Sequence, residues 1–222
     1  MRFPASGHPG RFALMAGQDA APRRRRDPQR RIEEIIAATE RVIASKGIEG
    51  LTHRAVAEEA GVPLGATTYH FATREDLIAA AMQKAVDRFG AYLEDWGARR
   101  PGLTPEQFAV LLTDALMTSF TAEGRGQGVM EFELYLAALR RPALRRIADQ
   151  YAELNFRACS RYTDPVTAAA VAAATNGITL RGLAGSRPPT RDDVEAVLRR
   201  ILTPNPALEP VRAPAGTGGA GS

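Results

Sequence analysis

The sequence is poor in the residues that carry most enzyme chemistry. Its 222 residues include one cysteine, Cys159, and three histidines, His8, His53 and His70. A single cysteine excludes an internal disulfide, and these histidines show neither a metal-ligand spacing nor a Ser-His-Asp arrangement. No glycine-rich loop follows a strand pattern that could cradle phosphate. We therefore predict no catalytic residue, no metal site and no cofactor, and we interpret the protein as a non-enzyme.

Long hydrophobic runs are also lacking. The longest uncharged run, residues 165–180, is rich in Ala and Thr and is too short and too polar to cross a bilayer. The first residues alternate Arg, Pro, Gly and His without the apolar stretch of a signal peptide. We expect a cytoplasmic protein, in which Cys159 is either an ordinary buried thiol or a redox sensor.

Positive charge is concentrated at one end of the chain. Residues 1–29 contain six arginines and two aspartates, which accounts for the whole formal net charge of +4. The arginines at 23–26 stand between prolines without apolar neighbours, so residues 1–29 are predicted to be a disordered basic arm. Two interpretations stay open, a solvated tail that aids solubility and an arm that follows DNA phosphates or enters the minor groove. Residues 30–71 hold five basic and six acidic residues and are not a basic patch by composition.

The spacing of apolar residues predicts helices throughout and no strands. Thr73 with Asp76, and Thr104 with Gln107, have the spacing of capping boxes. Three glycines between 124 and 128 predict a flexible break between two helices. The helices are expected at 30–46, 74–100, 105–120, 130–141, 142–162, 166–184 and 191–202, together with two short ones within 52–71.

These patterns predict an all-α fold of about nine helices. A three-helix domain is expected over residues 30–73, and a helical bundle over residues 74–202. Beyond Leu202 the sequence turns to Pro, Ala and Gly, which predicts a disordered tail over residues 203–222.

Residues 52–71, THRAVAEEAGVPLGATTYHF, are the most informative segment. Thr52 can cap a first short helix, Gly61 permits the positive φ of a sharp turn, and Val62 fills the angle between the helices. The second helix carries small and hydroxyl side chains in place of a leucine stripe, so its backbone can approach base pairs. This is the pattern of a helix-turn-helix that binds DNA in the major groove.

The stretches GIEGLTH, GVPLGATTYHF and ATREDL resemble the TetR-type (tetracycline-repressor-like) transcriptional regulators, over residues 30–80. Thr67 stands where the family pattern has a buried Leu, and Thr68 stands where it has a phosphate-contacting Tyr. The resemblance implies a ligand-responsive dimeric regulator, most simply a repressor, that binds a palindromic operator in double-stranded DNA and is released by a small, largely apolar effector. The alternative is a helical small-molecule-binding or scaffolding protein without sequence-specific DNA binding.

Each DNA contact follows from side-chain chemistry. Arg54 is the strongest candidate for a base contact, because guanidinium can bind guanine in bidentate fashion. His70 is either a phosphate contact or a packing partner of Phe71. Gly65 allows close approach of the backbone, and thymine methyl contacts are expected from Leu64, Ala66 and Thr68. Phosphate contacts are expected from Thr52, His53, Tyr69, His70 and Arg74.

The resemblance also implies a homodimer and an effector cavity. The helices at 166–184 and 191–202 are expected to pair with their copies in a four-helix interface. Asn176 suits helix packing or ligand contact equally, and Arg181 would suit a ligand carboxylate. The apolar candidates for the cavity wall are also suited to plain core packing. The candidate ligand-binding residues are Leu112, Leu116, Phe120, Met130, Glu131, Leu134, Tyr135, Phe156, Asn176 and Arg181.

Overall fold

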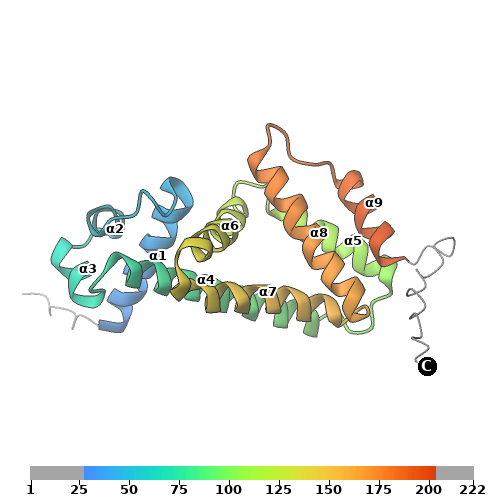
Figure 1. The fold of residues 1–222 in the computed structure, drawn as a ribbon, viewed down its shortest axis with the longest axis horizontal. Coiled ribbons are helices and arrows are strands. Elements are labelled where there is room, and N and C mark those ends of the chain that lie inside the picture. The colour runs from blue at the N-terminus through green and yellow to red at the C-terminus, as the bar shows by residue number, and fades with distance from the viewer. Residues whose placement is uncertain (1–27, 204–222) are drawn as a thin grey trace, which may run out of the picture.

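A computed structural model describes residues 28–203, and this part of the chain forms nine α-helices and one short 3₁₀ turn without strands (Figure 1). The predicted all-α class is therefore confirmed. The predicted basic arm and C-terminal tail fall almost entirely on residues 1–27 and 204–222, which lie outside the described residues. Within residues 28–203, no helix is both long and apolar enough to span a membrane. The elements are α1 (Pro28–Lys46), α2 (His53–Ala60), α3 (Leu64–His70), α4 (Arg74–Ala98), α5 (Pro105–Thr118), α6 (Arg125–Arg140), η1 (Pro142–Leu144), α7 (Arg145–Ser160), α8 (Pro165–Ala184) and α9 (Arg191–Leu202).

Local capping chemistry explains where several helices begin and end. The Thr52 hydroxyl accepts a hydrogen bond from the Ala55 N–H at 3.0 Å, and Gly61 ends α2 with a φ of 63°. Both predicted capping boxes form, at the starts of α4 and α5. In the first box the Thr73 N–H donates to Asp76 Oδ2 at 2.9 Å, while the Asp76 N–H donates to Thr73 Oγ1 at 3.1 Å. These ends are set by contacts within four residues along the chain.

The predicted break between two helices lies at residues 119–124, so it contains only Gly124 of the three glycines. Helix α6 begins at Arg125, so Gly126 and Gly128 lie inside it. Gly128 is buried, and a Cβ atom there would lie 2.7 Å from Leu183 Cδ1. A Cβ at Gly124 would overlap the carbonyl oxygen of Thr118. Gly124 and Gly128 therefore permit close packing, of the α5–α6 turn on itself and of α6 against α8.

Two hydrophobic cores are joined by the long helices α4 and α7, which lie side by side (Figure 1). The first core contains the helix-turn-helix, the first half of α4, and buried residues of α6, η1 and α7. The second contains buried residues of α5, α8 and α9 and the end of α7. Ile48 and Leu51, before α2, belong to the same core as Met130 and Leu134 of α6. A continuous core thus crosses the expected domain boundary after residue 73.

Candidate DNA-binding surface and ligand cavity

Helix α3 is held in place by Thr67, which is fully buried. Its hydroxyl donates to the Leu64 carbonyl oxygen at 2.8 Å and lies 3.3 Å from Nδ1 of His53. Because that hydroxyl proton is already used, His53 must be the donor in the second contact. Hydrogen bonds therefore satisfy a polar side chain at the inner position, while Leu64, Thr68 and Tyr69 of α3 are exposed.

Most of the predicted DNA contacts are exposed at the end of the molecule formed by α2 and α3 (Figure 1). Tyr69 is 84% exposed and its ring packs edge-on against His70, with 5.0 Å between centroids. No atom lies within 4 Å of the position of a Cβ on Gly65, so the backbone there is open to a partner. Arg54 is exposed on α2. This arrangement can offer hydroxyls, methyl groups and a guanidinium to a DNA groove.

Arg74 behaves differently from the other predicted contacts. Its Nε donates to the Leu51 carbonyl oxygen at 2.8 Å, and its Nη2 donates to the carbonyl oxygen of Ile48. The guanidinium thus supports the turn before α2 instead of reaching outward. A phosphate at this position would be bound by the backbone N–H groups at the start of α4 and not by the guanidinium.

The glutamates of the helix-turn-helix region are largely paired within the protein. Glu59 binds Arg41 at 2.5 Å, and Glu40 binds Arg88 of α4 at 3.1 Å. Glu34 pairs with two arginines of its own helix, Arg30 and Arg31. Such exposed pairs add little stability, but they offset the acidic charge of this region locally.

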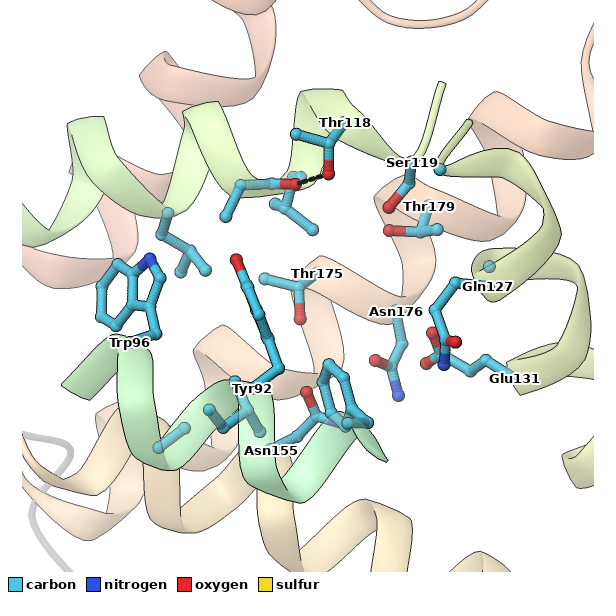
Figure 2. A pocket seen from close by; sticks show the side chains of 18 of the residues that line it. Tyr92, Trp96, Thr118, Ser119, Gln127, Glu131, Asn155, Thr175, Asn176 and Thr179 are labelled. Atoms are coloured by element: carbon cyan, nitrogen blue, oxygen red, sulfur yellow. Dashed lines mark hydrogen bonds between the residues drawn. The ribbon is translucent and has the colours of Figure 1, made fainter. Parts of the chain in front are cut away.

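A cavity of about 490 Å³ lies between the two cores, with walls from α4, α5, α6, α7 and α8 (Figure 2). Leu112 and Leu116 of α5 line it, as do Glu131 of α6 and Asn176 of α8. These four predicted ligand-binding residues are brought together from three separate helices.

The other six predicted residues do not line this cavity. Met130 and Leu134 are buried in the first core, and Phe156 packs against the second. The three that remain lie elsewhere: Phe120 against Gly182, Tyr135 against the ring of Tyr151, and Arg181 exposed at a second hollow between α8 and α9.

Sequence reasoning missed the aromatic wall that α4 contributes. Phe89, Tyr92 and Trp96 recur at spacings of three and four and face the cavity, with Tyr151 of α7 beside them. The rings of Phe89 and Tyr151 stack with centroids 4.8 Å apart and planes 20° apart. The spacing of the α4 aromatics shows that they share one face of the helix. It does not show whether that face packs in a core or lines a cavity.

Glu131 is the carboxylate of the cavity, and it belongs to a small polar network. Burial raises the pKa of its carboxyl to about 7, which a hydrogen bond from the Tyr151 hydroxyl opposes only in part. With its amide oriented to satisfy both polar atoms, Asn176 donates to Glu131 Oε1 at 3.2 Å and to the Ala172 carbonyl oxygen at 3.3 Å. Figure 2 shows Gln127 of α6 beside the same carboxylate. Burial and the charge of Glu131 also raise the pKa of Tyr151, so this phenol stays protonated.

Cys159 also lines the cavity and is buried. Burial raises the pKa of its thiol to about 11, so it remains protonated at neutral pH. A protonated thiol is a poor nucleophile, which favours the interpretation of Cys159 as an ordinary buried thiol. Among the described residues, no group of three His, Cys, Asp or Glu side chains could hold a metal ion.

Two protein-family models match the chain. "Bacterial regulatory proteins, tetR family" matches residues 35–81, and "Tetracyclin repressor-like, C-terminal domain" matches residues 103–204. A curated relative is the HTH-type transcriptional regulator PksA of Bacillus subtilis (strain 168), which is 37% identical over 73 residues. That match covers 33% of this chain and 36% of PksA, so the chain aligns with about a third of that protein.

Solved structures match over more of the chain. A member of the TetR family from Streptomyces coelicolor A3, SCO1917, is 43% identical with a TM-score of 0.65, over 77% of this chain and 97% of its own. The multidrug binding protein EbrR complexed with ethidium is 42% identical with a TM-score of 0.65, over 77% of this chain and 97% of its own. EbrR is also known complexed with proflavin and with malachite green. These two relatives span both the helix-turn-helix and the cavity.

Proposed function

The chain belongs to the TetR family of bacterial transcriptional regulators, and from this premise we propose that it is a dimeric repressor whose operator is released when a small effector fills the cavity. The observation that supports this most is the position of α6. This helix lines the cavity through Glu131 and shares the core of the helix-turn-helix through Met130 and Leu134. A ligand that displaces α6 would therefore act on the DNA-binding helices. Such a regulator would work in the cytoplasm, where bacterial DNA lies.

The proposed operator contacts are those exposed on α2 and α3. Arg54 is placed to contact base edges, while Leu64, Gly65, Ala66 and Thr68 would lie against the groove floor. Phosphates would be bound by the residues around them, Thr52, His53, Tyr69 and His70, and by the α4 amides at Arg74.

The proposed dimer uses the outward face of α8 together with α9, at the end of the molecule away from α3 (Figure 1). Val166 is 80% exposed and Leu180 is 47% exposed, and the exposed Ala173 and Gly177 lie between them at helical spacing. On α9, Val197 is 44% exposed. An apolar face of this kind favours a second copy of the same chain. Two copies would present two α3 helices to successive major grooves, about 34 Å apart.

The cavity has the size of a small-molecule site, since such sites measure about 300–1,000 Å³. Its aromatic and aliphatic walls favour a ligand with a large apolar surface. The complexes of EbrR with ethidium, proflavin and malachite green support an aromatic effector for this chain as well. The effector must bind the DNA-free arrangement more tightly than the DNA-bound one, because only differential affinity shifts the equilibrium.

Selection of the purified protein against randomised duplex DNA at near-physiological salt tests DNA recognition. We expect enrichment of a palindrome with half-sites about one helical turn apart. A dimer that enriches no sequence would contradict the proposal and favour a scaffolding role.

The variant Ala173→Arg tests the dimer, because it places a charge in the middle of the α8 face. We expect sedimentation velocity to show a monomer with weaker binding to the full palindrome. Ala152→Arg changes an exposed alanine of α7 and serves as the control, which should stay dimeric. A dimeric Ala173→Arg protein would exclude this interface.

A further inference from the structure

We propose that the effector is an aromatic cation whose positive charge lies against the carboxylate of Glu131. This inference rests on the proposed function, because it assigns the chemistry of the same effector. Its basis is the geometry of the cavity, in which a carboxylate is surrounded by aromatic rings and by neutral polar groups.

The carboxylate of Glu131 has no basic partner among the described residues. The groups around it are the Tyr135 phenol of α6, the Tyr151 phenol of α7 and the Asn176 amide of α8, all of which are neutral at physiological pH. From α4, Tyr92 and Arg88 also line the cavity. The Arg88 guanidinium is bound to Glu40 outside the cavity, with Nη1 at 3.1 Å from Oε2. Glu131 is therefore left as an uncompensated acid, which costs free energy whenever it is ionised.

The aromatic wall supplies the second half of the site. Phe89, Tyr92, Trp96 and Tyr151 line the cavity together, and the faces of such rings carry partial negative charge that attracts cations. Figure 2 shows Tyr92 and Trp96 on the α4 side, and Asn176 and Glu131 toward α8 and α6. A flat cationic ligand between these walls would contact ring faces over its body and the carboxylate at its charge.

The alternatives fit this cavity less well. A neutral apolar ligand would leave the ionised Glu131 without an opposite charge. An anionic ligand would be repelled by the carboxylate, and Arg181, the residue suited to an anion, lies outside the cavity. A cation supplies an opposite charge at a buried carboxylate, where the attraction is stronger than in water.

A matched pair of probes tests the charge preference. 1-Methylquinolinium and 1-methylnaphthalene share a two-ring frame with one methyl group and differ by one positive charge. Calorimetry at pH 8, where the carboxylate is ionised, should give at least tenfold tighter binding of the quinolinium to the wild-type dimer. Glu131→Gln should bring the two affinities within about twofold, which corresponds to a loss of about 1 kcal/mol or more. Glu153→Gln, an exposed carboxylate on α7, should retain the preference.

Proton release gives an independent readout. At pH 7 the cation should drive ionisation of Glu131, so its binding heat should depend on the ionisation enthalpy of the buffer in the wild type and not in Glu131→Gln. Equal binding of the two probes, binding of neither, or an unchanged preference in Glu131→Gln would each overturn the inference. Titrating the quinolinium into the protein–operator complex separates this from the proposed function: binding without operator release would leave the cation site standing and refute the effector role.

Discussion

Arg54 and Glu131 each carry one ionisable group, but the first is exposed and the second is buried. Arg54 is exposed on α2, so its guanidinium is open to solvent and its donors can bind a DNA partner. Glu131 lines a cavity, where loss of hydration disfavours its charge. The first residue is suited to recognition of a partner outside the molecule, and the second to recognition of a ligand enclosed by it.

For Arg54, we predict that Arg54→Ala lowers discrimination at one base pair of each half-site by about 1–3 kcal/mol, because a bidentate contact to guanine is lost. Competition between operator variants in a gel-shift assay measures this discrimination. Arg54→Lys preserves the charge but not the two-pronged geometry, so it should restore overall affinity more than base preference. Wild-type preference in both variants would exclude Arg54 as a base contact.

Glu131 should make stability depend on pH. Its pKa rises from an ordinary 4.5 to about 7 on folding, so the folded state binds the proton more tightly than the unfolded state. The stabilisation from this proton is complete below pH 4.5 and is lost as the pH rises through 7. Between pH 5 and pH 8, the free energy of unfolding of the wild type should fall by about 1–3 kcal/mol relative to Glu131→Gln. Urea unfolding at fixed protein concentration measures both proteins, and parallel pH profiles would refute the shift.

Among the elements, the junction of α5 and α6 shows how helices are brought close enough to enclose a cavity. Gly124 lies against the Thr118 carbonyl at the end of α5, and Gly128 lies against Leu183 of α8. A side chain at either position would separate the helices whose residues line the cavity. Gly126, between them, has only the Cβ of Ala44 near it, at 3.9 Å from the position of its own Cβ.

This difference predicts opposite effects of the same substitution. Gly124→Ala should destabilise the protein by about 1–3 kcal/mol, because the new methyl group meets backbone that cannot move aside cheaply. Gly126→Ala should be neutral or stabilising by up to about 1 kcal/mol, since alanine favours the helix and the space is open. Thermal unfolding of the two variants at one concentration makes the comparison. Equal effects would mean that the tight turn does not constrain α5 and α6.

At the scale of the whole molecule, α6 connects the cavity to the DNA-binding helices by polar contacts as well as by the shared core. The Ile48 N–H, in the turn before α2, donates to Glu133 Oε2 at 3.3 Å. Glu49 of the same turn binds Arg141, which follows α6, at 3.4 Å. Glu133 lies two residues beyond the cavity carboxylate Glu131. Movement of α6 on ligand binding would therefore act directly on this turn.

We predict that Glu133→Ala weakens the coupling between effector and operator by about 0.5–2 kcal/mol, because α6 loses its polar contact with the turn. The coupling free energy follows from the ratio of two effector affinities, one for the free protein and one for the operator complex. Calorimetry measures each affinity. Glu153→Ala is the control, since its carboxylate binds Arg157 on the exposed face of α7. An unchanged ratio in Glu133→Ala would show that the contact between Glu133 and Ile48 does not transmit the signal.

The sequence by itself determined the features that depend on residues close together in the chain. The all-α class, the two capping boxes and the Gly61 turn were all predicted, because each requires only contacts within about four residues. The helix-turn-helix was predicted for the same reason, and its exposed residues Arg54 and Tyr69 could be named in advance. A helical period shows which side chains share a face.

Only the tertiary structure decided what each face meets. Leu112 and Leu134 both belong to apolar stripes, yet the first lines the cavity and the second is buried in the core, because the angle between helices decides which stripe is covered. The aromatic wall of α4 was indistinguishable from a core stripe for the same reason. Arg74 and Arg181 carry the same group, but carbonyl oxygens brought near by the turn before α2 bind the first, and solvent surrounds the second. Five helices bury Glu131, and none of their side chains forms an ion pair with it in the part of the chain that the structure describes.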